Sequence, residues 1–196
     1  MVQLLKEMEE YAKENNIPIM MDDGLKFIED YIKKNNVKRI LEIGSAIGYS
    51  AIRMCLNENI CITTIERDEV RYKEAVKNIK KAKLENQITL IYDDALNIDL
   101  YEKYDLIFID AAKGQYIKFF EKFEKNLSEK GAIISDNLKF HGYTEQKERI
   151  KSKNLRQLVN KIRKYIEFLK ENNTYQTTFY DIGDGIGVTK KRTDDC

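Results

Sequence analysis

Hydrophobic residues recur along this chain at two spacings, and each spacing predicts a different element. Apolar positions three and four residues apart predict helices over 3–15, 25–32, 49–56, 69–82, 116–127 and 154–171. Short apolar runs predict strands over 40–43, 61–65, 88–92, 104–110, 131–135, 177–181 and 186–190. Strands that alternate with helices and close with a hairpin predict a doubly wound, Rossmann-like α/β sheet of seven strands, mostly parallel with one antiparallel strand.

The whole chain, 1–196, is expected to form a single domain, because its length suits one full hydrophobic core. Residues 1–35 hold the two helices that precede the first strand, and we expect them to lie over the ligand-binding face as a lid. The pair Asp22 and Asp23 is expected to cap the second of these helices. In the helix over 69–82 the residues expected to face inward are Tyr72, Ala75, Val76, Ile79 and Ala82.

The stretch 38–50, KRILEIGSAIGYS, reads as a buried strand, a glycine turn and the start of a helix. Such a turn lets the backbone approach a ligand and aims free N–H groups at it. Dinucleotides are bound by G-x-G-x-x-G, which is absent here; Gly44 and Gly48 are instead preceded by Glu42. A carboxylate there repels a pyrophosphate and attracts a cation, so we interpret the loop as an S-adenosylmethionine (AdoMet) site. The alternative is a purely structural strand-to-helix turn.

Acidic residues also close the next two strands. Glu66 ends the second strand, 24 positions after Glu42, where nucleotide-binding α/β folds place an acid that accepts the ribose hydroxyls. Asp93 and Asp94 follow the third strand. An acid at this point can accept a hydrogen bond from an adenine amino group, or it can simply cap a turn.

A second group of polar residues follows the fourth and fifth strands, namely Asp110 and the pair Asp136-Asn137. If those strands are neighbours, about 4.8 Å apart, the two carboxylates and the amide oxygen converge on one point. Such a set of oxygen ligands suits Mg²⁺ or a similar divalent cation. Lys113 lies in the turn after Asp110. A lysine beside a divalent cation gives up its proton more readily, which makes Lys113 the candidate general base, with simple solvation as the alternative. If AdoMet supplies a methyl group here, the expected methyl acceptor is an enol or phenol with a neighbouring oxygen, because the cation would bind both oxygens.

Composition narrows the function classes. Apolar runs stay well short of the ~20 residues that span a membrane, and we see no signal peptide, so a cytoplasmic protein is expected. Three scattered cysteines without CxxC spacing fit reduced thiols. Residues 1–30 carry a charge of −5 and residues 139–171 a charge of +6. The basic segment indicates either a polyanionic partner or solvated helix faces.

The motifs LEIGSAIGYS, TIERD, FIDAAKGQY, ISDN and IGDG, in this order, resemble those of metal-dependent class I AdoMet O-methyltransferases of the catechol and caffeoyl-CoA type. The resemblance runs from about Ile17 to Lys190. Three further stretches, YAKENNIPIM, NLRQLVNKIRKYIEFL and TTFYDIGDGIGV, most resemble the bacterial tRNA 5-hydroxyuridine methyltransferases, which make 5-methoxyuridine at the anticodon wobble position.

The resemblance implies a role for each candidate residue, and it implies a homodimer. The implied AdoMet contacts are Met20 or Met21, Glu42, Gly44, Ser50, Glu66, Asp93, Asp94, Ala95 and Asp110. The implied metal ligands are Asp110, Asp136 and Asn137, and the implied catalytic residues are Lys113 and Asp110. The chain departs from the family at Met21-Asp22, where an acid and a glycine are usual, and at Asp93, where a glycine is common.

The sequence leaves three candidate functions. The first is methylation of tRNA 5-hydroxyuridine, whose 5-hydroxyl and 4-carbonyl chelate as a catechol does; the basic segment would hold the phosphates. The second is a small-molecule catechol-type O-methyltransferase, which needs no basic segment. The third is a nucleotide-binding regulatory protein, which needs neither metal nor base. The candidate tRNA-binding residues are Lys139, Arg149, Lys151 and Arg156, and His141 has no assigned role.

Overall fold

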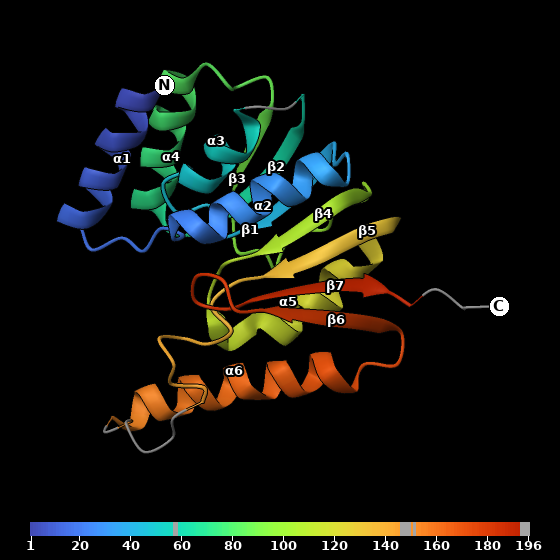
Figure 1. The fold of residues 1–196 in the computed structure, drawn as a ribbon. Helices are drawn as coiled ribbons and strands as arrows, with labels where there is room; N and C mark the ends of the chain where they lie inside the picture. Colours follow the sequence, from blue (N-terminus) through green and yellow to red (C-terminus); the bar gives the residue numbers. More distant parts are fainter. Residues whose placement is uncertain (57–58, 146–149, 151, 193–196) are drawn as a thin grey trace.

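Seven strands form one sheet in the computed structural model, which describes residues 1–56, 59–145, 150 and 152–192 (Figure 1). The strands are β1 (Arg39–Ile43), β2 (Cys61–Glu66), β3 (Ile88–Tyr92), β4 (Tyr104–Ile109), β5 (Leu127–Ser135), β6 (Tyr175–Tyr180) and β7 (Ile186–Lys191). Their order is β3-β2-β1-β4-β5-β7-β6. Only β7 is antiparallel to its neighbours, β5 and β6, so the predicted sheet is confirmed within these residues.

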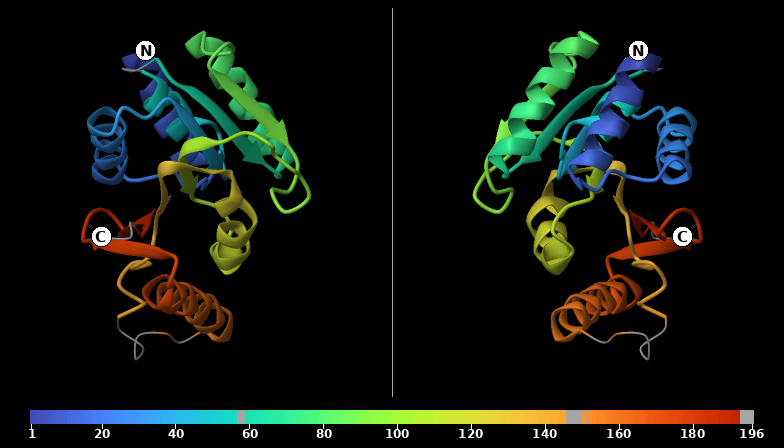
Figure 2. Two further views of the ribbon diagram at one scale, coloured as in Figure 1. Left: turned by 90° about the vertical axis from the view of Figure 1, so that its right-hand side faces the viewer. Right: turned by 90° about the vertical axis from the view of Figure 1, so that its left-hand side faces the viewer.

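Helices cover both faces of the sheet. The helices α1 (Val2–Glu14), α2 (Asp22–Lys34), α3 (Tyr49–Cys55) and α4 (Glu69–Ala82) share one apolar core with it, and α5 (Tyr116–Phe123) and α6 (Lys153–Glu171) share the other. Side chains alternate along a strand, so Ile40 and Phe108 enter the first core while Leu41 and Ile107 enter the second. Figure 2 shows α2 and α5 on opposite sides of the sheet.

The order of the strands reverses at β1, which pairs with β2 on one side and with β4 on the other. Chain connections therefore leave the sheet in opposite directions at this point and open a crevice beyond the carboxyl ends of the strands. Gly44 follows β1 at this crevice with a φ of +96°. A Cβ on Gly44 would lie 2.4 Å from the carbonyl oxygen of Asp110, so only glycine lets the ends of β1 and β4 come together.

Three local predictions were wrong. The strand β5 begins at Leu127 rather than 131, because Leu127 pairs with Tyr104 across an irregular register, and α5 accordingly ends before it. Val76, which was expected to face inward, is 44% exposed, because it follows buried Ala75 directly and so points to another side of α4. The helix α2 begins after Met21 without a side-chain cap. Asp23 instead accepts hydrogen bonds from the backbone N–H groups of Gly24 and Gly183.

The first two helices are packed against the body of the protein. Met8 and Ala12 of α1 and Leu25 and Ile28 of α2 are buried in the first core. Polar contacts add to this packing, because the Arg53 guanidinium of α3 pairs with a carboxylate of α2 at 2.8 Å. No helix in the described ranges is both long and apolar enough to cross a membrane.

Candidate active site

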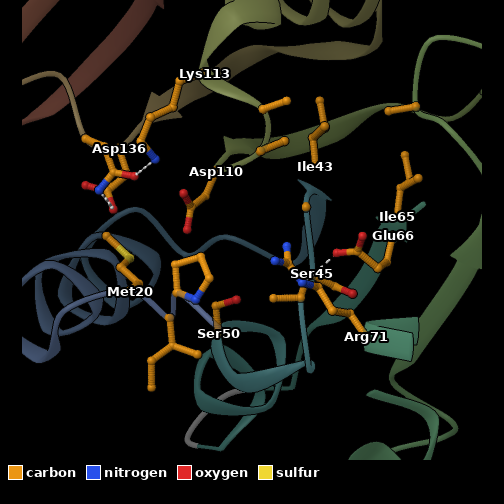
Figure 3. A pocket seen from close by; sticks show the side chains of 18 of the residues that line it. Met20, Ile43, Ser45, Ser50, Ile65, Glu66, Arg71, Asp110, Lys113 and Asp136 are labelled. Carbon is orange, nitrogen blue, oxygen red and sulfur yellow. Dashed lines mark hydrogen bonds between the residues drawn. The ribbon is translucent and has the colours of Figure 1, made fainter. Parts of the chain in front are cut away.

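A cavity of about 480 Å³ opens at the carboxyl ends of the central strands (Figure 3). Most of the predicted site residues line it, although they come from six separate turns. The predicted residues in its lining are Met20, Gly44, Ser50, Glu66, Asp93, Asp94, Ala95, Asp110, Lys113, Asp136 and Asn137. In Figure 3 Asp110 lies between Glu66 on one side and Lys113 with Asp136 on the other. The cavity therefore has two ends, joined at Asp110.

Glu66 is positioned by backbone donors at one end of the cavity. Its Oε2 accepts the N–H of Ala46 at 2.8 Å, and its Oε1 accepts the N–H of Asp68 at 2.8 Å. These bonds fix the carboxylate while one lone pair on each oxygen stays available. Two free acceptor positions on a fixed carboxylate match the vicinal hydroxyls of a ribose.

The turn after β3 makes the hydrogen bonds of a capped turn and also faces the cavity. Asp94 accepts the N–H of Leu96 at 2.9 Å and pairs with the Arg67 guanidinium at 3.1 Å. The bond from Leu96 lowers the pKa of Asp94. Asp93 accepts the N–H of Asp94 at 2.7 Å. The turn-capping interpretation is thus confirmed, and the contact with a ligand stays a prediction for a pair that lines the cavity.

Glu42 lies beneath the cavity rather than in its lining. The carboxylate is fully buried and accepts the hydroxyls of Ser50 and Thr64, each at 2.5 Å. Ser50 does line the cavity, so Glu42 reaches the ligand side through the Ser50 hydroxyl. Burial raises the pKa of Glu42 to about 7, although both hydroxyls oppose the shift.

This shift makes a prediction for stability. The pKa of this carboxyl is higher in the folded protein, about 7, than in the unfolded chain, 4.5. Its proton therefore stabilises the fold fully below pH 4.5, and this stabilisation is lost as the pH rises through about 7. Glu42→Gln has no such proton to lose. The free energy of unfolding of the variant, relative to wild type, is expected to rise by about 2.5 kcal/mol between pH 5 and pH 8. Urea unfolding at both pH values measures this, and a difference that stays constant with pH contradicts it.

The other end of the cavity holds two carboxylates, of which Asp110 is half-buried and Asp136 is buried. Asp110 follows β4 and Asp136 follows β5, and these strands are paired as expected. Asp136 is 2% exposed, and its pKa is raised by burial and by the neighbouring charge of Asp110. Burial also raises the pKa of Asp110. Two repelling carboxylates with little exposure to solvent form an arrangement that a divalent cation would stabilise.

Asn137 and Lys113 complete this end. The Lys113 ammonium donates to Oδ1 of Asn137, and the Asn137 amide donates to Asp136 at 3.1 Å. Asn137 adopts a left-handed φ of 58°, which turns its side chain back onto its neighbour. An amide oxygen has two lone pairs, so Oδ1 can accept from Lys113 and still coordinate a cation. The donor set therefore fits a hard divalent cation.

Of the N-terminal region that was expected to form a lid, only the segment between α1 and α2 lines the cavity. Pro18, Ile19, Met20 and Met21 line the cavity, whereas the two helices are packed on α3 and α4. Met20 is 6% exposed, and a Cβ on Gly24 would lie 2.7 Å from its Cε. The absence of a side chain at Gly24 thus allows Met20 to fold against the start of α2.

Of the predicted tRNA-binding residues, Lys139 and Arg156 lie within the described ranges, and neither lines the cavity. Lys139 pairs with Asp181 at 2.5 Å and with Glu145 at 3.7 Å, so neighbouring acids neutralise its charge. The Arg156 guanidinium donates to the carbonyl of Ile150 at 3.1 Å. Arg149 and Lys151 lie outside the described residues.

Sequence reasoning missed several lining residues, which are Arg71, Phe119, Phe140, His141 and Asp184. Arg71 stands in the first turn of α4, three residues after its capping Asp68. His141 is the only histidine of the chain, and Asp184 belongs to the IGDG motif. Both features were visible in the sequence, but only the fold brings these two residues together.

The chain is similar to known proteins over most of its length. A family model described as O-methyltransferase matches residues 1–192. Tapetum-specific methyltransferase 1 of Arabidopsis thaliana is 29% identical over 96% of this chain and 86% of its own. A Staphylococcus aureus structure provisionally described as a caffeoyl-CoA O-methyltransferase is 39% identical, with a TM-score of 0.90 over 96% of this chain and 92% of that one. The SAH-bound Podospora anserina methyltransferase PaMTH1, 22% identical, shares the fold with a TM-score of 0.88 over 97% and 88%.

Proposed function

Since the chain belongs to the AdoMet-dependent O-methyltransferase family, of the caffeoyl-CoA and catechol type, we propose that its acceptor is 5-hydroxyuridine at the anticodon wobble position of tRNA. The product would be 5-methoxyuridine. The observation that carries this proposal is the pair formed by half-buried Asp110 and buried Asp136, which lines the cavity beside Asn137 and Lys113. That group suits an acceptor with two neighbouring oxygens, and 5-hydroxyuracil presents a hydroxyl beside a carbonyl.

The AdoMet molecule would extend from Glu66 to Asp110. Glu66 offers its free lone pairs to the ribose hydroxyls, and Asp93, Asp94 and Ala95 flank the adenine. Gly44 and Ser50 lie towards the methionyl group, with the buried carboxylate of Glu42 behind the Ser50 hydroxyl to attract its ammonium. Met20 covers this region from the N-terminal segment. The methyl group is then held close to Asp110, where the two ends of the cavity meet.

Asp110, Asp136 and Asn137 would hold a divalent cation, Mg²⁺ or a similar ion. Such an ion, when bound, lowers the pKa of an acceptor hydroxyl and fixes its orientation. Lys113 would accept the hydroxyl proton as an uncharged amine, after its ammonium has released a proton to solvent; its nitrogen already reaches Oδ1 of Asn137.

A basic face near Lys113 would contact the tRNA phosphates. The helix α6 packs against the turn Lys113–Gln115, and a Cβ on Gly114 would lie 3.1 Å from Cδ of Lys161. The exposed basic residues of this face of α6 are Lys153, Arg156, Lys161 and Lys164, and a fifth, Lys170, lies at the far end of the helix. Lys161 thus stands beside the proposed base, and it joins Lys139, Arg149, Lys151 and Arg156 as a candidate contact.

Charge reversal on α6 tests this face. Lys161→Glu is expected to raise the KM for tRNA roughly tenfold at moderate salt, about 1.4 kcal/mol, because it removes one phosphate contact and adds repulsion. The matched control is Lys170→Glu, at the far end of the same helix, where Nζ lies 5.8 Å from the Phe179 ring. We expect the control to behave as wild type. Equal tRNA kinetics for the two variants would contradict this binding face.

A catechol-type small molecule is the second candidate acceptor. The Catechol O-methyltransferase of Niastella koreensis is 35% identical over 122 residues, which cover 58% of this chain and 55% of that protein. A lone aromatic ring with two hydroxyls makes the same oxygen pair and needs no phosphate contacts. If a catechol is the substrate, Lys161→Glu should not change the activity of the enzyme.

The homodimer and the cytoplasmic location stay predictions from the resemblance and the composition. A dimer is expected to elute from gel filtration at about twice the chain mass of 23.1 kDa. Light scattering on the same sample gives the mass directly, and a mass of one chain would contradict it.

A further inference from the structure

The turn between β6 and β7 reaches back to the segment that follows Asn137. Three backbone N–H groups of that segment donate to it: Leu138 to the carbonyl of Gly185 at 2.9 Å, Lys139 to the carbonyl of Asp184 at 2.7 Å, and His141 to Oδ1 of Asp184 at 2.5 Å. The third bond is made by a side chain, so it can be removed without changing the backbone of the turn.

The segment held in this way has an unusual backbone. Phe140 and His141 have φ values of 45° and 56°, in the left-handed region that residues with a side chain rarely adopt. Such conformations persist only where surrounding contacts impose them. Gly185 allows the close approach, because a Cβ there would lie 2.8 Å from the backbone nitrogen of Lys139.

The turn is itself anchored away from this segment. The N–H of Gly183 donates to Asp23 at the start of α2, at 3.1 Å, and Ile182 packs against the first core. Asp184 is 8% exposed and lines the cavity. Its second oxygen, Oδ2, lies 3.9 Å from Nδ1 of His141. A fixed carboxylate thus faces a strained segment at the acceptor end of the cavity.

We propose that Asp184 is a positioning residue for methyl transfer, which holds the 138–141 segment in place through the backbone of His141. This segment sets the Phe140 ring 5.8 Å from the Lys113 ammonium and places His141 at the cavity wall. Asp184 thereby shapes the acceptor end without touching the AdoMet end. The inference rests on the proposed function only in placing the acceptor at that end.

The first test compares Asp184→Ala with Asp184→Asn. The alanine variant loses the acceptor for the His141 N–H, and we expect kcat/KM for the methyl acceptor to fall 10- to 100-fold. Its Kd for AdoMet, measured by calorimetry, is expected to stay within twofold of wild type. The asparagine variant keeps an oxygen that can accept the same N–H, so it should recover most of the lost activity. Asp99→Asn, at an exposed acid that pairs with Lys122 and does not line the cavity, is the matched control and should match wild type.

A second measurement does not depend on the acceptor. Amide hydrogen exchange at His141 is expected to be at least tenfold faster in Asp184→Ala than in wild type, and close to wild type in Asp184→Asn. Gly185→Ala, which pushes on Lys139 while keeping the carboxylate, should reproduce the loss of acceptor kcat/KM. It thus tests the same positioning if the Asp184→Ala protein does not fold.

Several results would overturn the proposal. Unchanged amide hydrogen exchange at His141 together with unchanged kcat/KM in Asp184→Ala would show that the 138–141 segment keeps its conformation without the Asp184 side chain. An Asp184→Asn variant as impaired as the alanine variant, with a raised metal requirement, would mean that the negative charge matters instead of the hydrogen bond. If wild type transfers methyl to neither acceptor, the proposed function fails, yet the exchange measurement still decides the role of Asp184.

Discussion

Asp136→Ala is expected to lower kcat/KM for methyl transfer about a thousandfold while leaving AdoMet binding within twofold of wild type. Asp136 is 2% exposed and, with Asp110, supplies the two carboxylates that would hold the cation. A bound cation contributes several kcal/mol to stabilisation of the transition state, and about 4 kcal/mol corresponds to a factor of 10³. Initial rates over a range of Mg²⁺ concentrations, with AdoMet affinity measured by calorimetry, give both quantities.

Protein stability separates this effect from misfolding. The two carboxylates repel each other, so removing one charge by Asp136→Asn should leave the cation-free protein at least as stable as wild type at neutral pH. Added Mg²⁺ or Mn²⁺ should raise the Tm of wild type but not of the variant, since only wild type binds the ion tightly. The control is Asp99→Ala, an exposed acid that pairs with Lys122. Full activity of Asp136→Ala in the presence of chelator would contradict the metal site.

The second large effect on the rate of methyl transfer is expected for Lys113→Met. The Lys113 nitrogen lies against Oδ1 of Asn137 at the acceptor end, and loss of a general base costs 10²- to 10⁴-fold in rate. We therefore expect kcat to fall by at least 10² with little change in the Kd for AdoMet. The matched control is Lys118→Met, an exposed lysine of α5 that should retain wild-type activity.

Lys113→Arg distinguishes a base from a structural cation. A guanidinium still donates to Asn137, but it holds its proton too strongly to accept and release one at neutral pH. If Lys113 is the base, the arginine variant should be nearly as slow as the methionine variant. Recovery of activity by arginine would show that Lys113 serves only to orient Asn137.

Local sequence patterns were enough to predict the sheet and the convergence of Asp110 with Asp136. Each of these acids directly follows an apolar strand, and consecutive parallel strands are often neighbours, as β4 and β5 are here. The same reasoning placed Glu66 at the end of β2, where its carboxylate indeed faces the cavity. These predictions succeeded because strand ends fix where a side chain lies.

Other features depend on contacts between distant parts of the chain, which no local pattern reveals. Glu42 sits beneath the cavity because Thr64 of β2 and Ser50 of α3 take both of its oxygens. Lys139 is neutralised by Asp181, which lies 42 residues further along the chain. Asp184 reaches the acceptor end only because β7 inserts antiparallel between β5 and β6.

The central claim is methyl transfer to a vicinal oxygen pair carried by tRNA, and one assay tests it most directly. Labelled AdoMet is incubated with tRNA bearing 5-hydroxyuridine, with the same tRNA bearing plain uridine, and with catechol, each with Mg²⁺ and with chelator. We predict strong labelling of the hydroxylated tRNA that chelator abolishes, and no labelling of the uridine form. Labelling of catechol alone would contradict the tRNA assignment, and labelling of the hydroxylated tRNA that persists with chelator would contradict the metal site.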